Sequence, residues 1–340
     1  MPKDAIRLDK NENRFGPAPE CLRLLGNITA ESLAEYGRRD SELVTALGKR
    51  YGVEEERIIT AYGAEELLVR IFNLLVKEGS RIALPAPSWW YYGELTKRSS
   101  AEIIEYKLLK CNDRFEYDYD ALWKIAKRQS PNLLIICSPN NPTGNRFDLE
   151  KLKALLAAFP TLTAIVDEAY EGFNGGSDEA LKLVERYENL IVLRSFSKFF
   201  ALAGLRVGWA ALADKPKERL KRFFDRYLGF SVVAEKVALK ALENERFYRE
   251  NARLISAERE RYYSALQGKN GIQAFKSEAN FVLLEFSDDY FDRFKEAIEK
   301  ESIKVRFFTD PSLQNFARIT IGVPQENTAI LNLLQRLFAG

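Results

Sequence analysis

Short runs of β-branched and aliphatic residues alternate with stretches of helical periodicity from about Tyr36 to Ala211. Parallel strands need a crossover connection, which is usually a helix, so this alternation predicts an α/β domain whose mostly parallel sheet is flanked by helices. We expect seven strands in the sheet, at residues 57–60, 81–84, 101–106, 132–137, 163–166, 190–194 and 207–212. We expect helices at residues 64–77, 121–127, 149–158 and 178–187.

The character of the sequence changes after Asp214. A long charged helical stretch over residues 216–268 is followed by short strand-like runs at 280–285, 304–308 and 318–321, with a helical stretch at 290–299. This pattern predicts a linker helix that leads into a smaller α+β domain. We therefore expect an N-terminal arm (1–30) that packs with the small domain, a large domain (31–215), and the linker helix with the small domain (216–340).

Composition excludes several classes of function. The chain has no histidine, which excludes histidine-based catalytic triads and histidine-ligated metal sites. Lysine and arginine number 51 and the acidic residues 49, so the net charge of +2 favours neither nucleic acid nor an anionic membrane. Cys21, Cys111 and Cys137 lie far apart without a C-x-x-C pair, which argues against disulfides and a thiolate zinc site. We expect no metal.

The expected location is the cytoplasm. The apolar runs are far shorter than the roughly 20 residues that span a bilayer, and the charged start MPKDAIRLDKNEN does not resemble a signal peptide. The partners are therefore expected to be small molecules, with no nucleic acid and no membrane. Without histidine, any catalysis must use lysine, acidic residues, tyrosine, arginine or a borrowed cofactor.

One segment carries the main chemical signal. SFSKFFALAGLRVGW (195–209) follows the apolar run LIVLR and places Ser195, Ser197, Lys198 and Arg206 around one turn-rich loop. A lysine just after a buried strand is partly desolvated, which disfavours the ammonium form and frees an amine that can form a Schiff base. Two hydroxyls and an arginine beside it form a candidate anion site. The loop therefore fits a phosphorylated carbonyl cofactor, pyridoxal 5′-phosphate, and a surface lysine is the alternative.

Three further motifs each follow a strand-like run. In VDEAY, the carboxylate of Asp167 can lie against a pyridine nitrogen and keep it protonated. In ITAYGAEELL, a strand leads through Gly63 into a helix that begins near Ala64 and Glu65, where free N–H groups favour an anion. SPNNPTG is typical of a turn, and its Asn141–Pro142 bond is a candidate cis peptide. Each motif alone is also explained by an ordinary turn or helix start.

Together the motifs resemble a known family along nearly the whole chain. SFSKFFALAGLRVG resembles the lysine signature of the class I/II aminotransferases of fold type I, and LDKNENRFGP resembles the opening of histidinol-phosphate aminotransferases. The resemblance implies that Lys198 binds pyridoxal phosphate and then acts as the general base, with Asp167 at the ring nitrogen. The implied reaction transfers the amino group of L-histidinol phosphate to 2-oxoglutarate, giving imidazole-acetol phosphate and glutamate, in histidine biosynthesis.

The resemblance also assigns the remaining cofactor contacts. Tyr170 and Asn141 match the residues that bind the phenolic oxygen of the ring, and Trp89 matches the aromatic residue that stacks on it, commonly a tyrosine. We interpret the aromatic residues that follow it in PAPSWWYY as core residues. They are Trp90, Tyr91 and Tyr92. The residues expected to hold the phosphate are Gly63, Ala64, Glu65, Ser195, Ser197 and Arg206.

Four other residues are matched to the partner subunit or the substrate. Tyr36 matches a tyrosine that reaches the phosphate of the neighbouring subunit's cofactor, which implies a homodimer. Arg318, in ARITIG, matches the arginine that pairs with the substrate carboxylate. Arg306 lies near the position of an arginine for the substrate phosphate, and Phe15 lies where the arm lines the substrate pocket.

Other functions stay open at this point. An aromatic amino acid aminotransferase and a threonine-phosphate decarboxylase share the scaffold, and a scaffold does not fix function. A nicotinamide-dependent oxidoreductase fits the α/β alternation, but no G-x-G-x-x-G opens a helix after a first strand. The last alternative is a protein that binds the cofactor without turnover.

Overall fold

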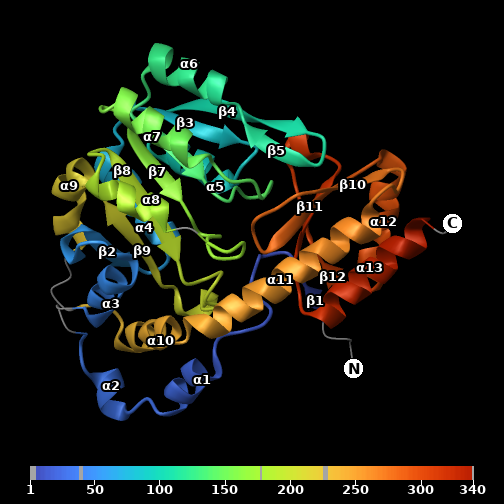
Figure 1. Ribbon diagram of the computed structural model, residues 1–340, viewed down its shortest axis with the longest axis horizontal. Coiled ribbons are helices and arrows are strands. Elements are labelled where there is room, and N and C mark those ends of the chain that lie inside the picture. The colour runs from blue at the N-terminus through green and yellow to red at the C-terminus, as the bar shows by residue number, and fades with distance from the viewer. Residues whose placement is uncertain (1–4, 38–40, 177, 225–228, 339–340) are drawn as a thin grey trace.

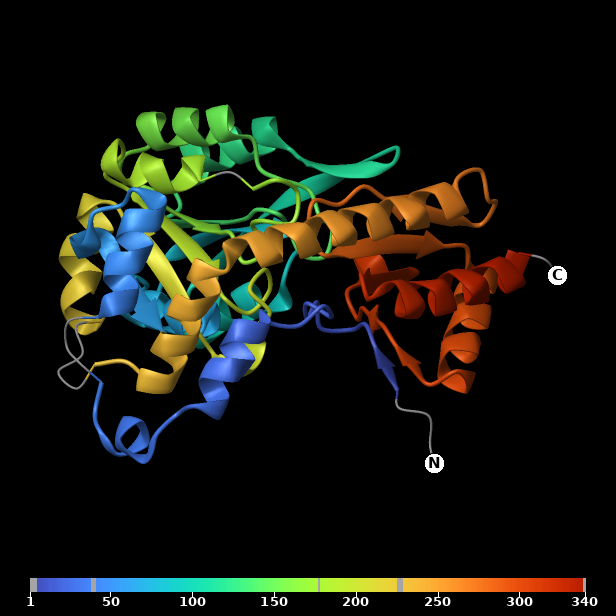
Figure 2. The ribbon, with the colours of Figure 1, turned by 60° about the horizontal axis from the view of Figure 1, so that its bottom comes forward.

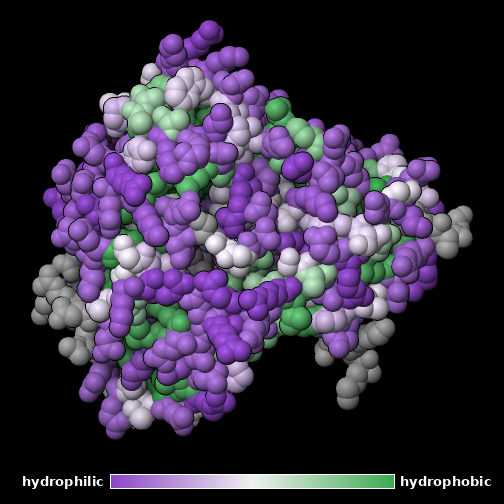
Figure 3. All heavy atoms as spheres, viewed as in Figure 1, coloured by the Kyte–Doolittle hydropathy of each residue, from purple (hydrophilic) through white to green (hydrophobic). Residues whose placement is uncertain are grey.

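The computed structural model describes residues 5–37, 41–176, 178–224 and 229–338. Within these residues the chain forms a large α/β part and a smaller α+β part, and α11 (Glu245–Leu266) extends from one to the other (Figures 1 and 2). On the face seen in Figure 3, hydrophilic side chains predominate over both parts and apolar residues appear in small separate groups. Among the described residues, no helix has both the length and the apolar character that a bilayer crossing requires.

The large part is built on a sheet with strand order β2-β9-β8-β7-β6-β3-β4-β5. From β8 to β4 the neighbouring strands run parallel, whereas β9 is antiparallel to β2 and β8, and β5 is antiparallel to β4. The expected mostly parallel α/β fold is therefore confirmed. The strands are β2 (Ile58–Ala61), β3 (Arg81–Ala86), β4 (Glu102–Cys111), β5 (Arg114–Tyr117), β6 (Leu133–Cys137), β7 (Thr163–Asp167), β8 (Leu190–Ser195) and β9 (Gly208–Leu212).

Both faces of this sheet are buried, as a parallel sheet requires. Along β8, Leu190 and Val192 join one apolar cluster, and Ile191 and Leu193 join another on the opposite face. Helices α4 and α5 contribute to the second cluster, and α3, α6 and α7 to the first. The helices are α3 (Glu42–Tyr51), α4 (Ala64–Leu75), α5 (Trp90–Arg98), α6 (Tyr119–Gln129), α7 (Leu149–Ala158) and α8 (Glu179–Lys182).

Three expectations about the elements need correction. Within the described residues the sheet has eight strands instead of seven, because β4 continues to Cys111 and turns back at residues 112–113 into the short strand β5. Helices α3 and α5 were not predicted. The stretch 216–268 is not one linker helix, since Ser231 caps the start of a new helix and Asn244 separates it from the next. The helices are α9 (Asp214–Phe224), α10 (Val232–Glu243) and α11.

The small part is an antiparallel sheet with strand order β10-β11-β14-β13. The small part also contains helices and a second, two-stranded sheet. In that sheet β1 of the N-terminal arm pairs in parallel with β12, which joins the arm to the small part. Farther along the arm, the Ala18 N–H donates to the Tyr248 hydroxyl of α11 (2.9 Å), and α1 packs on α10. The elements are β1 (Ile6–Arg7), α1 (Pro19–Gly26), α2 (Ala30–Ala34), β10 (Ile272–Phe275), β11 (Phe281–Phe286), α12 (Asp288–Lys300), β12 (Ile303–Lys304), β13 (Arg306–Phe307), β14 (Phe316–Thr320) and α13 (Pro324–Phe338). The domain boundaries stay a prediction.

Candidate active site

The candidate site lies at the carboxyl ends of three neighbouring parallel strands, β6, β7 and β8. Cys137 at the end of β6 pairs with Asp167 at the end of β7, and Asp167 pairs with Leu193 of β8. The loops that follow these strands carry most of the residues expected to bind the cofactor. Carboxyl ends of parallel strands meet at one edge of a sheet, so residues distant in the sequence converge there.

The Lys198 side chain lies in this site. Its Nζ donates to the backbone carbonyl of Lys10 (2.8 Å) and lies 5.8 Å from the centre of the Tyr170 ring. Burial, and next the positive charge of Arg318, lower the pKa of Lys198 from 10.5 to about 7. A substantial share of this amine is therefore unprotonated at neutral pH, as a nucleophile or a general base requires.

Asp167 is buried and has a donor for each oxygen. The backbone N–H of Ala169 donates to Oδ1 (3.0 Å), and the Tyr92 hydroxyl donates to Oδ2 (2.7 Å). Burial raises the pKa of Asp167, and these two hydrogen bonds oppose the rise. The residue is thus a buried carboxylate whose charge is favoured only by the hydrogen bonds around it.

The aromatic cluster after β3 only partly follows expectation. Tyr91 and Tyr92 are buried in the core, as expected, but Tyr92 also contacts Asp167, which sequence reasoning missed. Trp90 was expected in the core, and this was wrong: it is 63% exposed, because it begins α5 on the side away from the sheet. Trp89 precedes the helix and is partly buried, and its ring centre lies 5.3 Å from that of Tyr92.

Arg318 of β14 approaches the site from the small part. Its guanidinium donates to Asn141 Oδ1 and, through Nη2, to the Asp9 carbonyl (2.6 Å). The third nitrogen, Nε, is buried and has no partner among the described residues. Burial lowers the pKa of Arg318 to about 10. The structure therefore joins Arg318 to the loop after β6, where the Asn141–Pro142 bond is cis.

The start of α4 forms a cradle with Arg206. A Cβ at Gly208 would lie 2.5 Å from the Ala64 backbone nitrogen, so this close approach requires glycine. Gly63 favours glycine through its φ of 93°, and a Cβ there would lie 2.6 Å from the flexible end of the Arg206 side chain. Among the described residues no side chain caps this helix, which leaves its N–H groups available to an anion. Glu65 lies 3.8 Å from Arg206, with both side chains about half exposed.

Ser195 lies beside this cradle, because it pairs in register with Gly208, and Ser197 follows it by two residues. Ser195, at the end of β8, accepts a hydrogen bond from the Ser197 N–H (3.0 Å), which shapes the turn that leads to Lys198. Ser197 is buried. Strand β8 ends at Ser195, and the turn that follows contains Ser197 and Lys198. The two hydroxyls and the amine are therefore in one loop.

For three further expected site residues the structure gives exposure, packing and strand register. Tyr36 is 76% exposed. Phe15 packs against the main apolar core and is partly buried. Arg306 is exposed on β13, and it is paired in register with Arg318, so both side chains point to the same face of that sheet.

The N-terminal segment supplies site residues that sequence reasoning did not single out. Asn11 is buried, with its backbone in the left-handed region (φ 54°), and its Nδ2 donates to the Tyr170 hydroxyl (3.0 Å). Asn13 Nδ2 donates to the Phe199 carbonyl, one residue after Lys198 (3.0 Å). Burial raises the pKa of Tyr170 to about 12, so its hydroxyl keeps its proton. The motif NENRFGP was the available signal, but it did not indicate these contacts.

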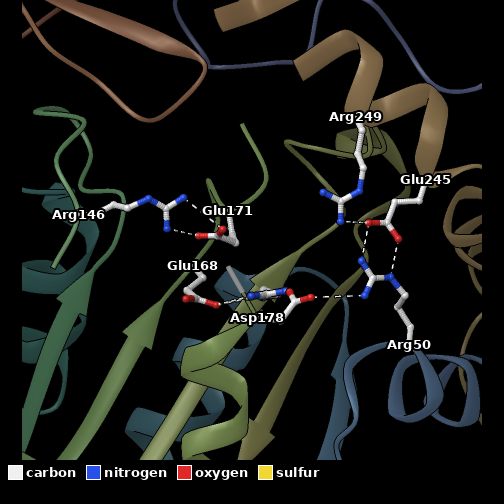
Figure 4. Close-up of polar contacts among 8 residues, drawn as sticks. Arg50, Arg146, Glu168, Glu171, Asp178, Glu245 and Arg249 are labelled. Carbon is white, nitrogen blue, oxygen red and sulfur yellow. Dashed lines mark hydrogen bonds and ion pairs between the residues drawn. The ribbon is translucent and has the colours of Figure 1, made fainter. Parts of the chain in front are cut away.

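A network of ion pairs lies at the ends of β7 and β8 (Figure 4), and the pair at its centre, Arg194 and Glu168, is buried. Glu168 follows Asp167 and Arg194 precedes Ser195, so both point away from the site side of the sheet. Arg194 donates to Glu168 (2.9 Å) and to Asp178 (2.7 Å). The network fixes the ends of β7 and β8 relative to each other. Beyond Asp178 it continues through Arg50, Glu245 and Arg249, and Arg146 with Glu171 lies beside it.

Comparisons with known proteins agree with this arrangement. Residues 3–336 match the profile of aminotransferase class I and II. Histidinol-phosphate aminotransferase of Ruminiclostridium cellulolyticum is 31% identical over 97% of this chain and 91% of that protein. Histidinol-phosphate aminotransferase 1 of Carboxydothermus hydrogenoformans is 35% identical over 97% of this chain and 92% of that protein.

Solved structures show the same fold. The crystal structure of histidinol-phosphate aminotransferase from Sinorhizobium meliloti in complex with pyridoxal-5′-phosphate has a TM-score of 0.87, at 22% identity over 98% of this chain and 91% of that one. The Clostridium acetobutylicum histidinol-phosphate aminotransferase has a TM-score of 0.86, also at 22% identity, over 98% and 99% of the two chains. Sequence profile, full-length relatives and fold thus confirm the resemblance seen in the motifs, and the chain belongs to the aminotransferase class I and II family.

Proposed function

We propose that this protein is a pyridoxal-phosphate-dependent aminotransferase that transfers the amino group of L-histidinol phosphate to 2-oxoglutarate. The observation that carries the proposal is the convergence, at one edge of the sheet, of the Lys198 amine, the buried Asp167 carboxylate and the cradle of Gly63 and Arg206. The two relatives described above match 97% of this chain and are named histidinol-phosphate aminotransferases, which supports the choice of substrate.

The residues present fit pyridoxal phosphate group by group. Lys198 offers an amine for the aldehyde, and Asp167 offers a buried carboxylate for the ring nitrogen. The uncapped start of α4 and Arg206 offer N–H donors and positive charge for the phosphate, in a cradle that a Cβ would fill. When bound, the cofactor supplies an electron sink that stabilises the carbanion left when the substrate loses a proton.

The chain's own residues supply the proton transfer and the orientation. The pKa of Lys198, lowered to about 7, lets its amine accept a proton at neutral pH, which is how a chain without histidine obtains a general base. The Asp167 carboxylate favours the protonated form of a pyridine nitrogen beside it. Tyr170 and Asn141 would hold the phenolic oxygen of the cofactor ring. The N-terminal segment, through Asn11, holds Tyr170 in place.

The substrate requires recognition of an anion. Histidinol phosphate carries a CH2–O–phosphate group where histidine carries its carboxylate, and 2-oxoglutarate carries a carboxylate at the corresponding position. Arg318 has a buried Nε without a partner among the described residues, a donor that either anion can satisfy. Arg306 lies opposite Arg318 on the same face, and it adds the second positive charge that suits a doubly charged phosphate.

The proposed assembly is a homodimer in which Tyr36 reaches the neighbouring active site. The exposure of Tyr36 (76%) and of Leu33 (70%) on the adjoining helix α2 supports this, since exposed apolar side chains favour burial against another chain. The contribution of Phe15 to the substrate pocket is part of the same proposal. Cytoplasmic location stays a prediction.

A panel of amino donors tests the proposal. The purified protein is supplied with pyridoxal phosphate and 2-oxoglutarate, and glutamate formation is measured with L-histidinol phosphate, phenylalanine and threonine phosphate. We expect the highest kcat/KM with histidinol phosphate and no turnover by Lys198→Ala. A preference for phenylalanine would instead identify an aromatic aminotransferase. If the main reaction were the release of carbon dioxide from threonine phosphate, the proposal that the protein is an aminotransferase would be wrong.

A further inference from the structure

We infer that Tyr92 is a positioning residue, which holds the Asp167 carboxylate and the Trp89 ring in the arrangement that the cofactor ring needs. The inference rests on the proposed function and adds a residue to it. Tyr92 follows Trp89 by three residues, at the start of α5, and is 1% exposed. It therefore lies beneath the site, out of reach of the substrate.

Two contacts of this one side chain carry the inference. The Tyr92 hydroxyl donates to Asp167 Oδ2 (2.7 Å), and the edge of its ring meets the Trp89 ring with an interplanar angle of 84° and 5.3 Å between ring centres. Asp167 is the proposed partner of the ring nitrogen, and Trp89 is the proposed stacking residue. A movement of Tyr92 would displace both, so the two groups are positioned as a unit.

The partner of the hydroxyl distinguishes Tyr92 from ordinary buried tyrosines. Any buried hydroxyl needs an acceptor, and backbone carbonyls usually provide it. Tyr106 donates to the Ile135 carbonyl (2.6 Å), and Tyr117 donates to the Cys137 carbonyl (2.5 Å). Tyr92 lies beside the same strands but donates to a carboxylate. A hydrogen bond to a charged acceptor is about twice as strong as one to a neutral acceptor, so this donor has an electrostatic effect as well.

That effect acts on the charge that Asp167 needs. Burial favours the neutral carboxyl, whereas hydrogen bonds from Tyr92 and Ala169 favour the carboxylate. Burial also raises the pKa of Tyr92 well above its ordinary value, so the hydroxyl remains a donor throughout the working pH range. Each carboxylate oxygen keeps a second lone pair, which leaves an acceptor for a protonated ring nitrogen.

The test compares Tyr92→Phe with Tyr106→Phe in the cofactor-loaded enzyme. Both tyrosines are 1% exposed, and both variants lose one buried hydroxyl, so Tyr106→Phe controls for packing. We expect Tyr92→Phe to weaken cofactor binding about tenfold or more, measured by cofactor fluorescence, and to lower kcat with little change in the KM for histidinol phosphate. It should also shift the pH midpoint of the bound cofactor's visible absorption. Tyr106→Phe should leave all three at wild-type values.

A second substitution keeps the result interpretable if Tyr92→Phe folds poorly. Replacing Tyr92 with 3-fluorotyrosine retains the ring and makes the hydroxyl a stronger donor, so the absorption midpoint should move in the direction opposite to that of Tyr92→Phe. Equal effects of Tyr92→Phe and Tyr106→Phe, or an unmoved midpoint in both Tyr92 variants, would overturn the inference. A wild-type protein that binds no pyridoxal phosphate would instead refute the proposed function.

Discussion

Lys198 should titrate near neutral pH in the cofactor-free protein. Burial and the charge of Arg318 lower its pKa from 10.5 to about 7, with Glu12 acting in the opposite direction. At pH 7 about half of the Lys198 side chains are then free amines, compared with roughly 0.03% for an ordinary lysine. The reactive form is thus about a thousandfold enriched before any cofactor binds.

Two substitutions separate the causes of this shift. Arg318→Met removes a nearby positive charge, so the pKa of Lys198 should rise, although burial should keep it below the ordinary value. Glu12→Gln removes a negative charge, so the pKa should fall. The lowered pKa also affects stability. The unfolded chain binds more protons than the folded chain between about pH 7 and 10.5, so the penalty for burying the charged Lys198 amine disappears and the unfolding free energy rises with pH across that window.

The assay is competitive labelling with trace acetic anhydride from pH 5.5 to 9.5, followed by mass spectrometry of the Lys198 peptide. Labelling of Lys198 should reach half its maximum near pH 7 and move up in Arg318→Met and down in Glu12→Gln. Labelling of Lys198 only above pH 9, together with the bulk of the surface lysines, would contradict the lowered pKa. A lower midpoint in Arg318→Met would contradict the electrostatic effect of Arg318.

Three further predictions concern the ion pairs, the substrate and the dimer. Arg194→Met should lower the unfolding free energy by about 3–5 kcal/mol in urea, because it leaves the buried Glu168 without its partner, and the added change Glu168→Met should recover part of the loss. Arg306→Ala should raise the KM for histidinol phosphate but not for glutamate, whereas Arg318→Ala should raise both in steady-state assays. Inactive Lys198→Ala and Tyr36→Ala subunits, when mixed, should regain activity at about a quarter of all sites, because half of the dimers restore one site; no recovery would contradict a shared site.

The large sheet could be predicted because its signal is periodic. Apolar runs bounded by turns mark the buried parallel strands, and once the strands are parallel their carboxyl ends must share an edge. This is why Asp167 and the lysine loop could be placed at one site from the sequence. The short strand β5 was missed because four residues with alternating burial, next to a tight turn at 112–113, give too little pattern to recognise.

Contacts between distant residues could not be predicted, because no local pattern encodes them. Arg318 meets Asn141 across 177 positions of sequence, and Tyr92 meets Asp167 across 75. The aromatic run indicated a buried position for Tyr92, and this was confirmed. Burial alone does not say what a hydroxyl points to, which depends on how α5 packs on the sheet.

The N-terminal segment gives the clearest physical reason for this limit. Three successive backbone carbonyls accept hydrogen bonds from side chains: Asp9 from Arg318, Lys10 from Lys198, and Asn11 from Asn280. A carbonyl is present at every position whatever the side chain, so residue types cannot reveal which ones are used. The conformation that aims them depends on β1, which pairs with β12 some 300 residues later in the chain. The positions of Lys198 and Arg318 therefore depend on the folded conformation of the N-terminal segment. Side-chain types alone do not predict them.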